Sequence, residues 1–483
     1  MTQPAELRET HISVVTMIGD RAYKLMKPVA TGFLDHRQRR DRLAACAREV
    51  EVNRRFAPDV YLGVLDIVSE DGVPVDHLIE MRRMPASRAL AGLLDAPAAE
   101  GRVAEVARLV AAFHRDSPSS PTIDRAGMPW TLRALWDEGL DALERIGGDI
   151  ISERDVERVR DLVHDYITGR RALFESRIAD GWIRDGHGDL LTADIYMLDD
   201  GPRILDCLAF DDRLRHGDVL LDAAFLAMDL ETRGHPQLAA LLLDEWSREL
   251  GERHPRSLRD HYVAYRAHVR AKIAAIRAVQ GDLQASAEAR RLHTFALTRL
   301  MESRVRLILV GGLPGTGKST LAEGLGVSEG ATVLRSDVLR KELAGVATTG
   351  EAGSPFEQGL YRPETTAKVY EELLHRAGPL LSRGETVVVD ASWTSAARRR
   401  AARDLARARR ATVVELHCVL PAEVAASRMQ KRRRHGGDAS DATPEIARLM
   451  QARSDAWPEA NPIDTIAGPD DVLAEARRMV RER

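Results

Sequence analysis

Eight consecutive residues near the start of the last third of the chain could bind phosphate. They read Gly-Leu-Pro-Gly-Thr-Gly-Lys-Ser and run from Gly312 to Ser319. The glycines let the backbone curl so that successive N–H groups face phosphate oxygens. Lys318 would then reach the β and γ phosphates of ATP, and the Ser319 hydroxyl would ligate Mg²⁺. We therefore predict a nucleotide site made by Gly312, Gly315, Gly317, Lys318, Ser319 and Thr320.

Two aspartates and a group of arginines downstream could complete this site. In doubly wound folds ligands lie beyond the carboxyl ends of the strands, where we expect Asp337 and Asp390. Asp337 would accept the proton of an acceptor hydroxyl, and Asp390 would hold Mg²⁺ through water. Each could instead cap the helix that follows it. Arg428, Arg432 and Arg433 could close over the phosphates or could form a solvated basic helix face.

A second set of residues with chemical potential lies in the first half of the chain. Asp189 belongs to an HGD loop, Asp194 follows five residues later, and Asp206 is expected at the end of a short strand. In protein-kinase chemistry one loop carboxylate orients the acceptor hydroxyl and two further ligands hold metal against the phosphates. Lys24 on a strand and Glu49 on the next helix could form the ion pair that positions the phosphates. The alternatives are a solvated edge lysine and ordinary turn carboxylates.

Length and composition limit the classes of protein that can carry these residues. A chain of 483 residues predicts two or three domains. The net charge of −4 argues against bulk binding to nucleic acid or to anionic membranes. Three widely spaced cysteines predict buried, reduced thiols rather than disulfides or a zinc site. The chain has no apolar run near the length of a membrane span and no apolar signal core at its start, so we expect a cytoplasmic protein.

The elements that must position the first set follow from hydrophobic periodicity. A small β-rich lobe is expected over 1–90, with a hairpin around Gly19 and Asp20 and a helix from 37 to 56. A helical lobe is expected over 91–302. Within it, helices are predicted at 103–114, 132–146, 155–178 and through much of 218–304.

The remaining residues, 303–483, alternate five apolar β-rich runs with helical stretches. This alternation predicts a parallel sheet with helices on both faces. Two irregular segments, 345–363 and 434–445, are long enough to serve as lids. The Arg/Ala-rich helix at 396–410 is interpreted as mostly surface.

The C-terminal motifs carry a family resemblance. GGLPGTGKST, RSDVLRKEL and VVVDASW, in that order, resemble the small-molecule and polynucleotide kinase branch of the P-loop kinases, and zeta-toxin-like kinases are similar too. The resemblance covers residues 304–460. It implies that Asp337 is the acceptor-side base and that the arginines from Arg428 to Arg433 form a lid, but it names no substrate.

The N-terminal motifs resemble a different family. HGDLLTAD and ILDCLAF are similar to the aminoglycoside-phosphotransferase family, and the whole layout resembles bacterial fusions of such a domain with an ATP-binding kinase. The implied fold is an α+β protein-kinase-like bilobal domain followed by an α/β P-loop domain. The family's metal-binding Asn is Asp194 here and its usual His is Leu191. Aspartate is still a hard oxygen ligand for Mg²⁺. The first hairpin has no GxGxxG, so a less regular loop at 10–14 would cover the nucleotide.

Three functional hypotheses follow. In the leading one, each half transfers the γ-phosphate of ATP to a small hydroxyl or amine acceptor of the aminoglycoside, sugar or nucleoside class, using Mg²⁺. In the second, the N-terminal half is a ligand-sensing module that gates the C-terminal kinase. In the third, the C-terminal domain is a polynucleotide kinase, which the acidic overall charge disfavours.

Acidic residues outside these sets have two interpretations. Asp211, Asp212 and Glu231 would suit a cationic acceptor or could simply be solvated. Asp218, Asp222 and Asp229 are interpreted as helix-end or packing residues rather than catalysts. The oligomeric state is left open.

Overall fold

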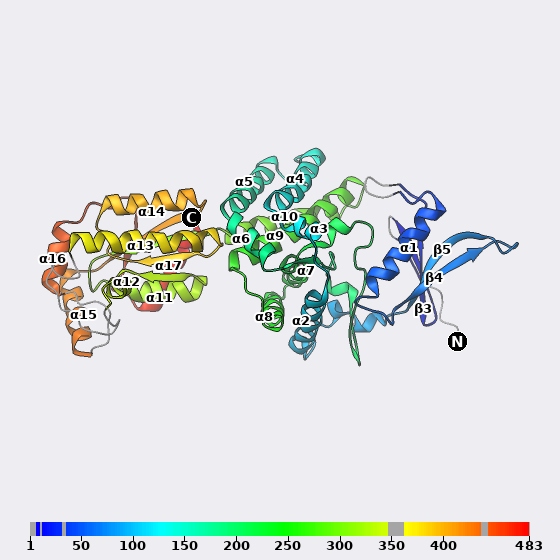
Figure 1. The fold of residues 1–483 in the computed structure, drawn as a ribbon, viewed down its shortest axis with the longest axis horizontal. Coiled ribbons are helices and arrows are strands. Elements are labelled where there is room, and N and C mark those ends of the chain that lie inside the picture. The colour runs from blue at the N-terminus through cyan, green and yellow to red at the C-terminus, as the bar shows by residue number, and fades with distance from the viewer. Residues whose placement is uncertain (1–5, 10–11, 31–34, 346–361, 436–442, 483) are drawn as a thin grey trace. The chain divides into compact units, whose positions relative to one another are not determined.

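The chain forms two compact units (Figure 1). The computed structural model describes residues 6–9, 12–30, 35–345, 362–435 and 443–482. The first unit comprises residues 1–153, 175–254 and 262–296, and the second comprises residues 154–174, 255–261 and 297–483. Each unit has its own sheet, as expected for a protein of this length.

The first unit begins with a five-stranded antiparallel sheet of order β1-β2-β3-β5-β4. Gly19, with φ of 59°, makes the predicted turn between β2 and β3. Helix α1 packs on the sheet through Cys46 and Val50, which join a core with Ala22 and Ile79. The edge strand β1 was not predicted, because its four exposed residues, ELRE, hold a single apolar side chain and give no alternating pattern. The bounds are Glu6–Glu9 (β1), Ser13–Ile18 (β2), Arg21–Met26 (β3), Arg39–Asn53 (α1), Tyr61–Val68 (β4) and Pro74–Arg82 (β5).

A mainly helical region follows, interrupted by two short antiparallel two-stranded sheets, and the HGD loop lies between β6 and β7. β6 pairs with β9, and β7 pairs with β8. Their bounds are Ile183–Asp185 (β6), Ile195–Leu198 (β7), Gly201–Ile204 (β8) and His216–Asp218 (β9). The helices are Ala99–Asp116 (α2), Pro121–Asp124 (α3), Pro129–Ile146 (α4), Val219–Thr232 (α7), Pro236–Leu250 (α8), Arg256–Val279 (α9) and Ala285–Glu302 (α10).

The single helix predicted over 155–178 is wrong, because the chain breaks it into α5 (Glu153–Gly169) and α6 (Arg171–Ala179). A Cβ at Gly169 would lie 2.8 Å from the carbonyl oxygen of Arg409, so only glycine permits this approach. Arg170 is buried and donates to the carbonyl groups of Leu381, Arg409 and Arg410. These contacts tie α5 into the second unit, and no local sequence pattern encodes them.

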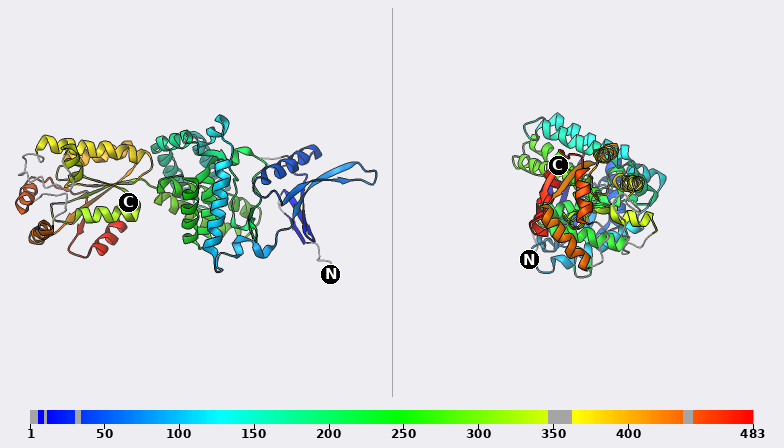
Figure 2. Two further views of the ribbon diagram at one scale, coloured as in Figure 1. Left: turned by 60° about the horizontal axis from the view of Figure 1, so that its bottom comes forward. Right: turned by 90° about the vertical axis from the view of Figure 1, so that its left-hand side faces the viewer.

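The second unit is the predicted parallel sheet with helices on both faces. Its order is β11-β12-β10-β13-β14, and every pairing is parallel. Helices α11 and α17 cover one face, and α13 and α14 cover the other (Figures 1 and 2). The strands are Arg306–Gly311 (β10), Thr332–Arg335 (β11), Val387–Asp390 (β12), Thr412–Val419 (β13) and Asn461–Asp464 (β14). The helices are Lys318–Glu329 (α11), Ser336–Leu343 (α12), Pro363–Ser382 (α13), Ala396–Ala408 (α14), Ala422–His435 (α15), Pro444–Ala452 (α16) and Pro469–Glu482 (α17).

Several predictions concern residues at the margins of the described chain. Most of the two segments predicted as lids, and residues 10 and 11 of the expected nucleotide-covering loop, lie outside the described residues. The three cysteines are buried free thiols, as predicted. None of the helices within the described ranges combines the length and apolar character needed to cross a bilayer.

Candidate active sites

The structure brings Lys24 and Glu49 together as a shielded ion pair. Lys24 lies within β3, paired with Val15 and Ile79 on the neighbouring strands, and Glu49 lies on α1. The Lys24 Nζ is 2.7 Å from Glu49 Oε1 and 3.4 Å from Asp206 Oδ1. Burial opposes the charge of Lys24, but the two carboxylates outweigh it and raise the pKa of Lys24. The ammonium group is therefore a fixed positive charge facing Asp206.

The HGD loop is held from behind by a buried carboxylate on α7. The backbone N–H groups of His187 and Gly188 donate to the two oxygens of Asp222, at 2.7 and 2.8 Å. Gly188 has φ of 88°, and a Cβ there would lie 3.0 Å from the carbonyl oxygen of Leu214. This geometry fixes the backbone just before Asp189.

Two more buried side chains extend this support. His114 on α2 lies with Nε2 3.0 Å from Asp222, and its Nδ1 accepts a 3.0 Å hydrogen bond from Trp246 on α8. His114 therefore carries its proton on Nε2 and donates it to Asp222. On the other side of the loop, Asp229 accepts from both the N–H and the hydroxyl of Thr192. The loop is thus anchored to three helices, α2, α7 and α8.

Sequence analysis missed the positioning roles of Asp222 and Asp229. Asp218 does cap α7, accepting from the N–H of Leu220 at 2.9 Å, which agrees with the helix-end interpretation. Asp222 and Asp229 instead hold the loop. The sequence did hold a signal for these roles, because Asp222 and Asp229 are the two charged residues in a buried and otherwise apolar stretch, residues 219–230 of α7. Buried carboxylates require polar partners, and here the partners are loop amides.

Three carboxylates face the front of the loop, and they repel one another. Burial, with Asp206 as a further contributor, raises the pKa of Asp189 to about 6. Burial, then Asp206 and Asp189, raises the pKa of Asp194 to about 7. Lys24 lowers the pKa of Asp206, which has a left-handed φ of 65° and an exposed side chain. An all-oxygen anionic donor set of this kind fits Mg²⁺. Among the described residues, no three acidic, His or Cys side chains enclose a metal ion by themselves.

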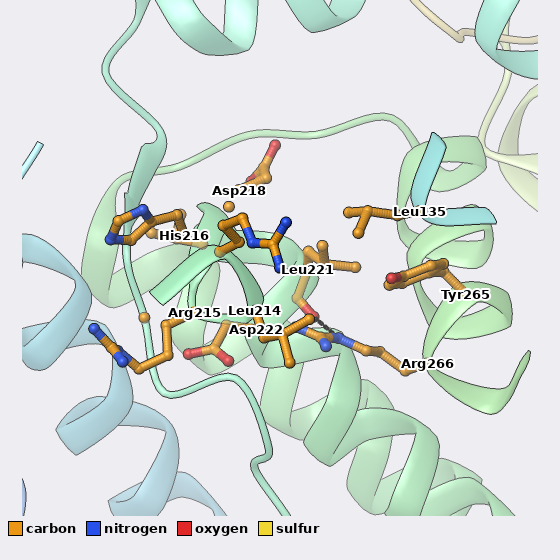
Figure 3. A pocket seen from close by; sticks show the side chains of 13 residues that line it. Leu135, Leu214, Arg215, His216, Asp218, Leu221, Asp222, Tyr265 and Arg266 are labelled. Atoms are coloured by element: carbon orange, nitrogen blue, oxygen red, sulfur yellow. Dashed lines mark hydrogen bonds between the residues drawn. The ribbon is translucent and has the colours of Figure 1, made fainter. Parts of the chain in front are cut away.

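The pocket directly behind the loop is too small to hold an acceptor. Its volume is about 30 Å³, and it is lined by Leu135, Arg215, Asp222, Tyr265 and Arg266 among others (Figure 3). Space of that size suits a water molecule rather than a sugar. Arg266 donates to the carbonyl groups of Leu221 and Gly188 and so adds support to the loop.

Two of the three acidic residues proposed to attract a cationic acceptor, Asp211 and Asp212, form ion pairs with arginines. Asp211 forms an ion pair with Arg213 at 2.7 Å. Asp212 contacts both Arg48 and Arg215, at 2.9 and 2.7 Å. These carboxylates are already neutralised by arginines, so they give no support to a cationic acceptor.

In the second unit the glycine loop connects β10 to α11 with the required backbone. Gly312, Gly315 and Gly317 have φ of 137°, 81° and 85°. A Cβ would lie 2.6 Å from the carbonyl oxygen of Cys418 at Gly312, and 2.7 Å from that of Ala425 at Gly315. The loop therefore needs glycine both for its dihedral angles and for its packing. Its curled amides at the start of α11 fit a phosphate group.

The other predicted residues of this site gather around the loop. The Ser319 hydroxyl donates to Asp390, which ends β12, at 2.7 Å. Lys318 contacts the carbonyl oxygen of Leu313 at 3.2 Å. The hydroxyl and the carboxylate are oxygen ligands suited to Mg²⁺ and its waters. Burial raises the pKa of Asp390, Lys318 opposes this shift, and Asp337 adds to it.

Asp337 does not end a strand, contrary to the prediction. β11 ends at Arg335, and Asp337 lies in the first turn of α12. Arg335 keeps an extended backbone with φ of −111°, and the chain turns helical at Ser336, so the strand ends two residues before Asp337. The carboxylate still lies on the side of the sheet where Asp390 ends its strand.

Arg428 lines a pocket beside the glycine loop. The pocket has a volume of about 380 Å³ and is lined by Gly315, Gly317, Thr320, Leu321, Arg428, Thr465, Ala467, Pro469 and Val472. Arg428 donates to the carbonyl oxygen of Thr465 at 2.8 Å, which fixes it at the rim. The helical backbone of α15 includes Arg432 and Arg433, whose side chains lie outside the described structure.

The comparisons with known proteins agree with this architecture. An AAA domain model matches residues 307–456. The uncharacterized protein Rv2004c of Mycobacterium tuberculosis is 40% identical over 466 residues, which cover 96% of this chain and 93% of that protein. Mb2027c of Mycobacterium bovis, also an uncharacterized protein, matches with the same figures: 40% identity, 96% and 93%.

Solved structures align separately with the two parts. A sugar kinase from Janibacter sp. is 22% identical, covers 36% of this chain and 94% of its own, and has a TM-score of 0.29. A choline/ethanolamine kinase family protein from Mesorhizobium loti is 16% identical, covers 62% of this chain and 92% of its own, and has a TM-score of 0.37.

The first unit has an antiparallel sheet followed by helices, and the second has a parallel sheet that carries the glycine loop and matches an AAA domain. The chain belongs to the family of the mycobacterial proteins Rv2004c and Mb2027c.

Proposed function

We propose that the chain is a bifunctional phosphotransferase in which each half carries the γ-phosphate of ATP to a small hydroxyl or amine acceptor. One observation carries this proposal: each unit holds a lysine and a carboxylate-centred oxygen set around its own loop. In the first unit the pair of Lys24 and Glu49 meets Asp206. In the second, Ser319 meets Asp390 behind the glycine loop.

The roles in the N-terminal site follow from position and charge. Lys24 binds the α and β phosphates, and Glu49 keeps its ammonium group in place. Asp189 orients the acceptor and takes its proton as the acceptor oxygen or nitrogen bonds to the γ-phosphorus and the bond to the ADP oxygen breaks. Asp194 and Asp206 hold Mg²⁺. The metal ion, when bound, supplies positive charge that offsets the charge developing on the phosphates.

The roles in the C-terminal site are the corresponding ones. The amides from Gly312 to Gly317 cradle the phosphates, Lys318 binds the β and γ phosphates, and Ser319 with Asp390 holds Mg²⁺. Asp337 accepts the proton of the acceptor. Arg428 lies at the pocket beside Gly317, where it can hold the nucleotide. Arg432 and Arg433 follow on the same helix and are proposed to close over the transferring phosphates.

The test is Mg²⁺-dependent ATP consumption by the full chain across a panel of aminoglycosides, sugars, amino sugars, nucleosides and oligonucleotides. Asp189→Asn should abolish one acceptor activity and Lys318→Ala the other, each by at least about 100-fold. Asp200→Asn and Lys368→Ala, at exposed positions, are matched controls that should change neither activity.

Asp194 and Leu191 favour a second candidate, in which the N-terminal unit is a ligand sensor that gates the P-loop kinase. That candidate replaces the proposal if Asp189→Asn leaves every activity intact while Lys318→Ala abolishes all of them. Phosphate transfer to oligonucleotides alone, with steep salt dependence, would instead assign the P-loop domain to nucleic acid.

A further inference from the structure

A second cavity lies in the second unit at the end of the sheet away from the glycine loop. Its volume is about 260 Å³. The strands β10 and β12 begin beside it, whereas the glycine loop and Asp390 lie at their carboxyl ends. The cavity is lined by Pro255, Arg256, Ser257, Arg304, Arg306 and Glu385 among others. None of these residues belongs to the two proposed active sites.

Arg306 is the central residue of this cavity. Its side chain is 8% exposed, and its two Nη atoms donate to the carbonyl groups of Arg304 and Met301 at 2.9 and 3.1 Å. Its Nε has no hydrogen-bond partner within the described structure, and no carboxylate there forms an ion pair with it. Burial, then Arg304, lowers the pKa of Arg306 to about 10, and the charges of Glu329 and Glu302 oppose this shift only in part. A buried charge without a counter-ion is unfavourable unless something compensates it.

The carboxylates that line the cavity are engaged elsewhere. Glu329 forms an ion pair with Arg477 at 3.2 Å, and Glu302 forms one with Arg299 at 2.7 Å. Glu385 accepts a hydrogen bond from the Thr332 hydroxyl at 2.8 Å. Glu329 and Glu302 still act on Arg306 through their charge, but burial outweighs them, and the Nε of Arg306 keeps no hydrogen-bond partner within the described structure.

The start of α9 adds anion-binding groups to the same cavity. This helix of 24 residues begins at Arg256, so its positive dipole end and its first amides lie at the cavity wall. The N–H groups of Leu258 and Arg259 both bond to the carbonyl oxygen of Pro255. The earlier amides, of Arg256 and Ser257, make no backbone hydrogen bond within the described residues. Arg481, exposed on α17, lines the rim.

We propose that this cavity is a binding site for a small phosphorylated compound, whose phosphate group pairs with Arg306 and the start of α9. The volume accommodates a phosphate with a few further atoms, as in a sugar monophosphate. We assign binding rather than reaction to this cavity, because its carboxylates are engaged in the contacts given above. The proposal does not depend on which acceptors the two active sites use.

The test measures binding of inorganic phosphate and of glycerol 3-phosphate to the full chain by calorimetry. Because the glycine loop also binds phosphate, the measurement is made in the Lys318→Ala background. Adding Arg306→Met should weaken the remaining binding at least tenfold and should raise the melting temperature without ligand, since an unpaired buried charge is removed. Glycerol 3-phosphate binding more tightly than inorganic phosphate would identify an organic phosphate as the ligand, whereas equal affinities would reduce the proposal to a simple anion site.

Arg481→Glu is the second variant, because an exposed position tolerates charge reversal without loss of folding. It should weaken phosphate binding several-fold, whereas Arg478→Glu, on the same helix but outside the cavity lining, should not. The proposal is overturned if Lys318→Ala alone removes all phosphate binding. It is also overturned if Arg481→Glu and Arg306→Met both bind phosphate as the Lys318→Ala background does.

Discussion

At the scale of single residues, the N-terminal site is defined by charges that are held apart from water. Lys24 and Glu49 form an ion pair, whereas the pKa values of Asp189 and Asp194 are raised, because burial and then the neighbouring carboxylates disfavour their ionised forms. Sites that bind cations and phosphates commonly hold such unbalanced charges.

The pKa of Asp189, raised to about 6, sets the pH dependence of transfer at the N-terminal site. Asp189 must be ionised to accept a proton, so kcat/KM should fall about tenfold per pH unit below about pH 6. Protonation at the same time favours the folded state, because burial disfavours the ionised form. Arg270 opposes the shift, so Arg270→Met should move the midpoint of the pH profile upward. An unchanged midpoint in this variant would assign the titration to another group.

The ion pair between Lys24 and Glu49 should behave as a buried pair in unfolding experiments. Lys24→Met leaves a buried carboxylate without its partner and should cost about 3–5 kcal/mol. Lys24→Met combined with Glu49→Met should cost clearly less, because both charges are removed. Lys27→Met, which breaks a more exposed pair with Glu9, should cost clearly less than Lys24→Met, because solvent screens that pair. Equal melting temperatures for the single and double variants would contradict this account.

At the scale of elements, α7 places the catalytic loop. Asp222 accepts hydrogen bonds from two backbone N–H groups of the loop and from the His114 ring. Asp229 accepts a hydrogen bond from the N–H group of Thr192. The position of Asp189 is therefore set by a helix that does not itself touch a substrate. Such support can decide a rate, because small displacements of a reacting group are costly.

Asp222→Asn should separate positioning from nucleotide binding. One loop N–H, or the His114 donor, loses its acceptor, so kcat of the N-terminal activity should fall by about 10- to 100-fold. KM for ATP should change little, because Lys24 and Glu49 lie on other elements. Asp244→Asn, at an exposed position on α8, is the control. A rise in KM with unchanged kcat would show that Asp222 acts on nucleotide binding instead.

At the scale of the whole molecule, two units with separate sheets predict two nucleotide sites per chain. Calorimetry with a non-hydrolysable ATP analogue and Mg²⁺ should give a stoichiometry of two for the native chain. Lys318→Ala should reduce it to one, and Lys24→Met with Glu49→Met should also reduce it to one. A native stoichiometry of one, abolished by Lys318→Ala, would leave the N-terminal unit without a nucleotide.

The sequence by itself determined the local parts of this protein. The glycine loop is a run of eight residues whose types dictate its dihedral angles, and the five strands around it show as apolar runs between helices. The order of Lys24, Glu49, Asp189 and Asp206 also indicated which residues would meet. These features depend on short-range sterics and on periodicity, which a single sequence displays.

Only the tertiary structure decided the rest. The contact of His114 with Asp222 joins residues 108 positions apart, and that of Trp246 with His114 joins residues 132 apart. The break at Arg170 depends on carbonyl groups more than 200 residues away. The cavity around Arg306 likewise combines the start of one helix with two strand starts from distant segments. Such partners are chosen by how the helices and sheet pack, which no local pattern records.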